Sequence, residues 1–523
     1  MKLIKSTARL VKQILPSKLY AFCYRSYFQF KMYIENTNTI TVLSSSEISD
    51  SNRKKVHFQL TTFTSFLEIL DSITQDILNQ FSSFRLFAIR NEIESNNCFC
   101  LYGDKESFNE EVRQLIYQGF RVSIGARDYS NTRSDFYGLS FKQRSPVCLY
   151  KVYCSSKGAV VYNRDTAVHI HLLRQADSGA LTCPSNNYCF STLGRGVIEN
   201  RHLLAMMKQT PEFDFEVDVV ITWVDGDDPS WIKSKDCYAN AVVKAPASSM
   251  SRSRYQSRDE IKYSIRSILM YAPWVRNIYL VTDNQIPEWF HPNNKVRIID
   301  HTDIFIDKGV LPVFNSHAIE ANLHRITGLA ENFLYFNDDF LLRKPVSKSS
   351  FFTAFGRQSK FFYSNIAFIP IEDQNGLLPV DLAARNNADI IESLTKFRPL
   401  RKFQHTPIAL KKSTLEKLES IAPEIFTHTS LSRFRAFSDY SIVSALAHHY
   451  GYYLGTAQPG EIKYTYIDLG DESARMRIER LFHNDQGYSC ICINDVDHTD
   501  DLDLVYLGEV LNSIYCQKSI AEA

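Results

Sequence analysis

The chain has 523 residues, more than a single compact hydrophobic core usually holds, so two or more domains are predicted. A hydrophobic content of 44% and a charged content of 22% are ordinary for a globular protein. The net charge of +1 excludes a general attraction to nucleic acid, and no apolar run reaches the roughly 18 residues of a membrane-spanning helix.

Residues 1–56 are predicted to be a basic N-terminal segment followed by a linker. No acidic side chain precedes Glu35, and the segment lacks the apolar core and cleavage site of a signal peptide. Read as a helix, it gathers apolar side chains loosely on one side, as a membrane-surface helix does. A solvated arm, or a helix docked on the protein itself, is the alternative.

Residues 57–210 alternate between helical and strand-like patterns and are predicted to form an α/β accessory domain. Helices are expected near 64–83 and 108–118, and the strand-like runs are FRLFAI, CFCLYG, FRVSIG, VCLYKVYC, AVVY and AVHIHLL. His169 and His171 alternate as strand residues do, so we expect them to be structural rather than metal ligands. No catalytic constellation is evident here, and the role of this domain stays open.

Eleven cysteines are present, an odd number without CxxC spacing. Cys98 and Cys100 are two residues apart in a strand-like run, as are Cys490 and Cys492, so each pair should share one face of its strand. A zinc site usually has closer-spaced ligands that include histidine. We therefore predict reduced core thiols, which favour a cytoplasmic location, with peripheral binding to the inner face of the plasma membrane as an extension.

From residue 211 to about 505, strands and helices alternate regularly. Buried strands are predicted at VDVVITWV, NIYLVTDN, KVRIIDH and ENFLYFNDDF, and helices at SRDEIKYSIRSILMYAPW and NSHAIEANLHRI, the latter capped by Asn315 and Ser316. This order predicts an α/β fold with a largely parallel, Rossmann-like (GT-A-like) sheet flanked by helices. Residues 506–523 are predicted to be a terminal helix.

Each of these strands ends in polar residues: DGDDP, TDN, DH and NDD. The carboxyl ends of parallel strands share one edge of a sheet, where ligands bind. Crowded carboxylates repel one another and raise each other's pKa, which a divalent cation relieves. Oxygen ligands suit Mg²⁺ or Mn²⁺. Taken alone, DGDDP is more typical of a simple turn than of a functional site, because Asp, Gly and Pro all favour turns.

These motifs carry a family resemblance. DVVITWVDGDDPSW resembles the first conserved region of the Stealth family, and the span from RSRDEIKYSIRSILMYAPW to ENFLYFNDDFLL resembles the second. AARNN, HTPIAL and RFRAFSDYS resemble the third region, and CICINDVD resembles the fourth. The family includes bacterial capsular polysaccharide phosphotransferases and the α/β subunit of the eukaryotic GlcNAc-1-phosphotransferase.

The resemblance implies a catalytic phosphotransferase domain over residues 211–505. Its reaction would move a sugar 1-phosphate from a UDP-sugar to a hydroxyl of a capsular or cell-surface polysaccharide, forming a phosphodiester and releasing UMP. The implied partners are the UDP-sugar, an oligo- or polysaccharide acceptor, and capsule assembly or export machinery at the inner membrane.

The principal site residues combine the resemblance with side-chain chemistry. Asp228 is the first choice for an essential carboxylate, because of its place in the family motif. His405 is the predicted general base, since a neutral imidazole accepts a hydroxyl proton near neutral pH. Arg435 and Arg325 are predicted phosphate clamps. Arg325 has the alternative of pairing with Glu320 on its own helix.

The remaining predictions are metal ligands and substrate contacts. Asp338 and Asp339 are the predicted ligands of Mg²⁺ or Mn²⁺, and Asp495 either closes the metal site or forms a turn. His301 and His324 are rival bases. The predicted substrate contacts are Asp225, Arg258, Asp283, Asn284, His301, Asn315, Ser316, Glu320, His324 and Asn337.

Three other functions remain open from the sequence. A conventional metal-dependent glycosyltransferase would form a glycosidic bond and release UDP. An inactive sugar-nucleotide-binding protein would bind without turnover, although retention of the acids, His405 and Arg435 argues against it. A metal-dependent hydrolase would release sugar phosphate without an acceptor.

Overall fold

The computed structural model describes residues 58–59, 64–84, 86–89, 97–101, 105–125, 127–128, 145–185, 189–194, 196–197, 200, 211–239, 255, 257–369, 379–483, 487–494 and 501–522. The predicted basic segment and the predicted ligand Asp495 lie outside these residues. Within them, no helix has the length and apolar character to cross a membrane.

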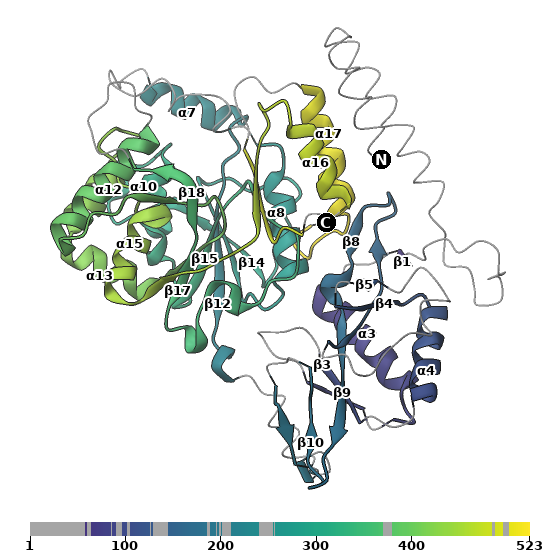
Figure 1. Cartoon of the computed structure of the whole chain (residues 1–523). Coiled ribbons are helices and arrows are strands. Elements are labelled where there is room, and N and C mark those ends of the chain that lie inside the picture. Colours follow the sequence, from purple (N-terminus) through teal and green to yellow (C-terminus); the bar gives the residue numbers. More distant parts are fainter. Residues whose placement is uncertain are drawn as a thin grey trace, which may run out of the picture.

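The predicted parallel sheet is present, and the α/β class is confirmed (Figure 1). Its strand order is β14–β13–β12–β15–β20, with the first four strands parallel and β20 antiparallel at one edge. The strands are β12 (Val217–Thr222), β13 (Ile278–Thr282), β14 (Val296–Asp300), β15 (Asn332–Asn337) and β20 (Ile408–Lys411).

Helices cover both faces of this sheet, which explains why β12, β13 and β15 are nearly unbroken apolar runs. Figure 1 shows the helices of the two faces on opposite sides of the strands. One face carries α8 (Glu260–Tyr271), α16 (Ala474–His483) and α17 (Asp501–Ile514). The other carries α12 (Pro379–Thr395), α13 (Lys412–Ile421), α14 (Pro423–Ser430) and α15 (Ala447–Leu454).

The register brings the predicted strand ends level with one another. Thr222, the last residue of β12, pairs with Val281 on one side and Asn337 on the other. Thr282 in turn pairs with Asp300. The polar residues that follow these four strands therefore meet at one edge of the sheet, as the sequence predicts.

A smaller sheet continues directly from the NDD motif. Its order is β16 (Phe340–Leu342), β23 (Cys490–Asn494) and β22 (Tyr464–Asp468). Phe340 pairs with Cys492, and Cys492 pairs with Tyr466. Residues far apart in the sequence are thereby brought next to the carboxyl edge of the main sheet.

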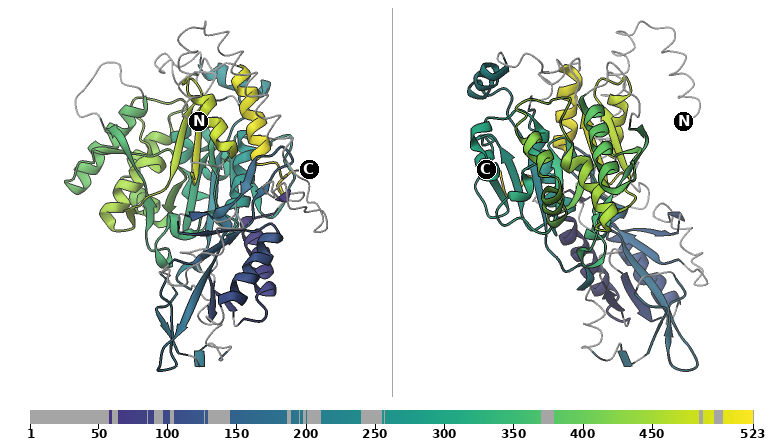
Figure 2. Two further views of the ribbon diagram at one scale, coloured as in Figure 1. Left: turned by 45° about the vertical axis from the view of Figure 1, so that its right-hand side comes forward. Right: turned by 90° about the vertical axis from the view of Figure 1, so that its left-hand side faces the viewer.

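The N-terminal elements form two sheets of their own, one of three strands and one of eight, and the larger lies below the main sheet in both views of Figure 2. The predicted strands appear as β2 (Leu86–Ile89), β3 (Asn97–Leu101), β4 (Arg121–Ile124), β6 (Val147–Tyr150), β7 (Tyr153–Cys154), β8 (Val160–Tyr162) and β9 (Val168–Gln175). The helices are α3 (Phe66–Gln80) and α4 (Lys105–Tyr117), where the sequence predicts them.

The cysteine pairs and His171 are structural, in β3, β9 and β23. Cys98, Cys100, Cys490 and Cys492 are all buried free thiols. His171 is buried and engages Ser185 Oγ at 2.7 Å and Asn97 Oδ1 at 2.8 Å. Both ring nitrogens are thus used inside the sheet.

Arg343 joins the N-terminal elements to the rest of the protein. Its fully buried guanidinium donates to the carbonyls of Val160 and Leu481 and to the hydroxyl of Tyr271. Lys344 adds an ion pair with Asp165 at 2.5 Å. These contacts fix β8 and the segment that follows it against α8 and α16.

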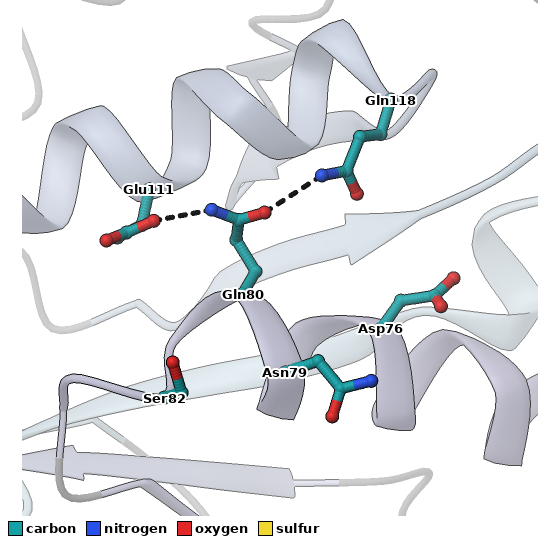
Figure 3. A pocket seen from close by; sticks show the side chains of 6 residues that line it. All are labelled: Asp76, Asn79, Gln80, Ser82, Glu111 and Gln118. Carbon is teal, nitrogen blue, oxygen red and sulfur yellow. Dashed lines mark hydrogen bonds between the residues drawn. The ribbon is translucent and has the colours of Figure 1, made fainter.

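A polar hollow of about 420 Å³ lies between α3 and α4 (Figure 3). Gln80 is held at its centre, donating to Glu111 at 2.6 Å and accepting from Gln118 at 2.8 Å. None of the six lining side chains is cationic, so the hollow does not suit a diphosphate. The six are Asp76, Asn79, Gln80, Ser82, Glu111 and Gln118.

Candidate active site

The DGDDP loop leaves β12 and starts α7 (Pro229–Ala239). Asp228 caps this helix: its Oδ1 accepts from the backbone N–H and the hydroxyl of Ser230, at 2.8 and 2.7 Å. Asp225 Oδ1 accepts from the backbone of Asp227 at 3.0 Å, and Asp227 is exposed. The loop is thus a real turn, and one oxygen of Asp228 is committed to it.

Gln285 fixes the same loop and was not identified from the sequence. Its side chain accepts from the backbone N–H of Asp225 at 2.9 Å and donates to the Asp225 carbonyl at 3.0 Å and to Asp228 Oδ2 at 3.1 Å. Hydrogen bonds from Gln285 and then Ser230 lower the pKa of Asp228. The only signal in the sequence is its place just after the strand-end motif TDN.

The neighbouring strand ends place two more acids together. Asp300 caps the short helix α9 (His301–Ile304) and accepts from the backbone of Asn284, which has a φ of 55°. Burial, and then the nearby Asp300, raise the pKa of Asp283 to about 6. His301 Nδ1 lies 3.8 Å from Asp283, and burial lowers the pKa of His301 to about 4. His301 is 3% exposed, which favours a positioning role over that of a base.

Asp338 and Asp339 follow β15, and within the described part of the chain no ion pair or hydrogen bond joins either carboxylate to a basic side chain. Burial, and then Asp339, raise the pKa of Asp338 to about 8, while burial raises that of Asp339 to about 6. Glu260, at the start of α8, adds repulsion to both and was also missed from the sequence. Its carboxylate accepts from the backbone of Arg258 at 2.7 Å.

The two oxygens of Asp339 have different surroundings. Oδ2 lies 3.2 Å from the thiol of Cys492, which donates to it. Oδ1 is buried and has no hydrogen-bond partner. A buried acceptor without a donor is costly, so this oxygen is suited to receive a ligand. Within the described residues, however, no group of three or more His, Cys, Asp or Glu side chains is arranged to hold a metal ion.

His405 lies at the same edge. Its ring contacts Tyr466, whose strand partner Cys492 donates to Asp339, so the imidazole lies near the NDD motif. His405 is exposed, and its ring centroid lies 5.1 Å from that of Tyr466. Desolvation and then the nearby Lys402 lower the pKa of His405, so the imidazole is neutral at neutral pH.

Behind these groups lies a polar cluster that holds Arg435. Its guanidinium donates to the hydroxyl of Ser316 at 2.7 Å, at the start of α10 (Ser316–Glu320). Glu320 is buried and accepts from Ser444 at 2.9 Å. The Tyr335 hydroxyl reaches Thr222 at 2.9 Å and Glu320 at 3.5 Å. Arg435 is therefore placed beside the ends of β12 and β15.

Arg325 and His324 are not brought to this group, which corrects their predicted roles. Arg325 forms an ion pair with Glu419 on α13, and His324 Nε2 lies 2.9 Å from the same carboxylate. The alternative pairing of Arg325 with Glu320 is also wrong. The guanidinium of Arg325, which was expected to bind phosphate, is instead paired with the carboxylate of Glu419.

Asn315 is likewise structural rather than a substrate contact. It is 0% exposed and caps α10 by accepting from the backbone of His317 at 3.1 Å. Its amide donates to the carboxylate of Asp439 at 2.8 Å and to the carbonyl of Ser432 at 3.0 Å. The predicted cap is confirmed, but no part of the side chain is left for a ligand.

Three family models match the residues that build this edge. They are Stealth protein conserved region 1 over residues 215–242, conserved region 2 over 254–360 and conserved region 3 over 404–452. The chain belongs to the Stealth family. The Stealth segments contain the strand-end acids, His405 and Arg435, whereas Tyr466 and Cys492 lie beyond them.

Two curated relatives of this chain are described as exopolysaccharide phosphotransferases. An exopolysaccharide phosphotransferase of Streptomyces coelicolor is 40% identical over 306 residues, which is 58% of this chain and 51% of that relative. The exopolysaccharide phosphotransferase CpsY of Mycobacterium tuberculosis is 33% identical over 282 residues, 54% of this chain and 52% of CpsY. The chain thus spans about half the length of the relatives it matches.

A solved galactosyltransferase, LgtC, in complex with donor and acceptor sugar analogues, aligns with 57% of this chain and 95% of its own. The TM-score is 0.30 and the sequence identity 11%. This similarity is too low to support an argument about the Stealth chain, whose fold class rests on its own strand pairings.

Proposed function

We propose that this Stealth chain is an exopolysaccharide phosphotransferase. It moves a hexose 1-phosphate from a UDP-sugar to a hydroxyl of a capsular or other cell-surface polysaccharide, forming a phosphodiester and releasing UMP. The observation that carries the proposal is the meeting of the strand-end acids, His405 and Arg435 at one edge of the sheet, all within the Stealth segments.

The acids fit Mg²⁺ or Mn²⁺ as part of this proposal. Mg²⁺ is commonly bound by one or two carboxylates together with substrate phosphates, so a complete protein cage is not required. Asp338 and Asp339 would hold the ion, with the unpartnered Oδ1 of Asp339 as one ligand. When bound, the ion would neutralise charge on the diphosphate. Asp225 and Asp228, fixed by Gln285, would border the same crevice.

The protein's own groups then have distinct tasks. A ring nitrogen of His405 takes the proton of the acceptor hydroxyl, whose oxygen forms a bond to the phosphorus next to the donor sugar. The bond from that phosphorus to the leaving phosphate breaks, and UMP departs. Arg435, oriented by Ser316, neutralises charge on the phosphate oxygens. These steps depend mainly on positioning and electrostatics, as phosphoryl transfer generally does.

The cellular setting belongs to the same proposal. The partners are a UDP-sugar, a growing polysaccharide and capsule assembly or export machinery. Donor synthesis inside the cell and a basic N-terminal segment favour a cytoplasmic enzyme that binds peripherally to the inner face of the plasma membrane.

The test is incubation of the full chain with UDP-sugars, Mg²⁺ and short oligosaccharides, followed by ³¹P NMR and nucleotide chromatography. The expected products are a phosphodiester resonance and stoichiometric UMP. Release of UDP with a new glycosidic bond would instead identify a glycosyltransferase. Sugar phosphate formed without an acceptor would identify a hydrolase, and binding without turnover an inactive protein.

A further inference from the structure

The pairing of His405 with Tyr466 places an aromatic side chain beside the candidate base. The two ring centroids are 5.1 Å apart with an interplanar angle of 54°. Tyr466 lies in β22 and pairs with Cys492, whose thiol contacts Asp339. Tyr466 thus lies between the imidazole and the NDD acids, on an element that neither the strand-end pattern nor the Stealth segments include.

The exposure pattern of β22 leaves this side chain accessible. Thr465 and Ile467 are 6% and 0% exposed and point into the core, whereas Tyr464, Tyr466 and Asp468 are partly exposed. Cys492, the neighbour of Tyr466 across the strand pair, is 0% exposed. Tyr464 and Tyr466 therefore lie beside the buried thiols, on the partly exposed face of the edge strand β22.

An acceptor sugar bound with one hydroxyl at His405 is large enough to reach the neighbouring Tyr466. A hydroxyl that gives its proton to His405 must lie within about 3 Å of a ring nitrogen. The rest of the pyranose extends well beyond that distance, so it must contact the side chains beside the imidazole. Tyr466 offers an apolar ring face for the C–H groups of a sugar and a hydroxyl for hydrogen bonding.

We propose that Tyr466 contacts the acceptor sugar and helps to set which acceptor the enzyme prefers. The proposal rests on the function proposed above and names a part of the acceptor site. The strand-end acids that would contact the donor lie in the family segments, residues 215–242 and 254–360, while Tyr466 lies after the last segment, 404–452. Family members that share a donor site but modify different polysaccharides would need acceptor contacts that differ between them. A contact outside the family segments, such as Tyr466, meets that need.

The kinetic test compares Tyr466→Ala and Tyr466→Phe with Tyr464→Ala, a matched control on the same face of the same strand. Initial rates are measured against UDP-sugar and against oligosaccharide acceptors that the wild type uses. Tyr466→Ala should raise the acceptor KM about tenfold and change the order of preference among acceptors, with the donor KM within twofold of wild type. Tyr466→Phe should recover most of the affinity, and Tyr464→Ala should behave as wild type. An unchanged acceptor KM, or an equal rise in both KM values, would overturn the proposal.

A binding test separates this proposal from the function on which it rests. Saturation-transfer NMR is recorded without donor, using di- to tetrasaccharides of glucose, galactose, mannose and N-acetylglucosamine. If wild-type protein shows no turnover yet binds a glycan that Tyr466→Ala no longer binds, the contact stands and the proposed reaction fails. If Tyr466→Ala binds every glycan as the wild type does, or if neither binds any, the contact is refuted whatever the turnover.

Discussion

The main sheet has aspartates at both the amino ends and the carboxyl ends of its strands, here called the amino edge and the carboxyl edge. The aspartates at the two edges differ in their hydrogen-bond partners. At the amino edge, Asp218 is 0% exposed and pairs with Arg276, whose Nε lies 2.9 Å away. Its oxygens also accept from the backbone of Asn277 at 3.1 Å and of Ala330 at 2.7 Å. Every oxygen has a donor, as expected for a structural acid.

At the carboxyl edge, no described ion pair joins Asp338 or Asp339 to a basic side chain, and Asp339 accepts a hydrogen bond from the Cys492 thiol. The pKa of Asp338 is raised to about 8 and that of Asp339 to about 6, and one oxygen of Asp339 has no partner. Charged carboxylates in this setting reduce the stability of the folded state. The difference teaches that a satisfied buried acid holds the fold together, whereas a crowded and unsatisfied one indicates a ligand site.

The largest expected effect is from Asp338→Asn. Turnover should fall to background because a metal ligand and a negative charge are lost. The free energy of unfolding should instead increase at high pH, where the wild-type carboxylate is charged. The pKa of Asp338 is raised on folding, so the folded protein binds more protons than the unfolded chain between about pH 4 and pH 8, and stability falls as pH rises through that window.

Without added metal at pH 8, Asp338→Asn should therefore be more stable than wild type, by about 1–3 kcal/mol. Chemical denaturation at pH 5 and pH 8, with and without Mg²⁺, measures this. Mg²⁺ should stabilise the wild type at pH 8 and have little effect on the variant. A variant that retains near-normal turnover would remove Asp338 from the site.

His405→Gln is expected to lower kcat by roughly 10²–10⁴-fold, because a general base is lost while the amide keeps hydrogen-bonding capacity. The pKa of His405 is lowered, so the wild-type rate should fall only as pH drops below the usual histidine range. The pH profile of kcat/KM should lose this limb in the variant. A rate within fivefold of wild type, with the limb unchanged, would assign the base to another group.

Asp218→Asn tests the structural edge. It removes the charge that Arg276 pairs with and weakens the bonds to two backbone N–H groups. We expect a loss of about 2–4 kcal/mol in the free energy of unfolding. The fraction that remains folded at 25 °C should turn over substrate at a near-normal rate. If Asp218→Asn lost catalysis and kept its stability, Asp218 would belong to the active site and would not be a structural acid.

The sequence was sufficient for features that depend on topology. Parallel strands buried on both faces give unbroken apolar runs, so β12, β13 and β15 could be located, and their shared direction predicts that the acids converge. The helix predicted over NSHAIEANLHRI is shorter, because the Asn322 amide donates to the Ala318 carbonyl at 2.8 Å and α10 ends at Glu320.

Features that depend on contacts between distant residues could not be predicted. Arg325 and Arg435 look equivalent in the sequence, and only the fold shows that Glu419, 94 residues from Arg325, forms an ion pair with it. Gln285 and Tyr466 carry no recognisable motif. They become candidates only because the sheet brings them beside DGDDP and His405.

The smallest expected effect is from Cys492→Ala, which changes one contact at the carboxyl edge. The thiol hydrogen bond lowers the pKa of Asp339, so its removal should raise that pKa further above about 6. A larger fraction of Asp339 is then protonated at pH 7, and Mn²⁺ affinity should fall about tenfold, as for other residues that orient metal ligands. Mn²⁺ binding is measured by electron paramagnetic resonance at pH 7 and pH 8.5.

Cys490→Ala provides the matched control, because Cys490 is buried on the same face of β23 and its described contacts include no carboxylate. Both variants remove one buried thiol, so both should lose similar stability. Only Cys492→Ala should weaken Mn²⁺ binding, and the loss should shrink at pH 8.5, where Asp339 is ionised in both proteins. Cys492→Ser, which keeps a donor, should restore part of the affinity. Equal Mn²⁺ affinities for the two alanine variants would mean that the thiol only fills space, and that the unpartnered oxygen of Asp339 does not depend on Cys492 for its orientation.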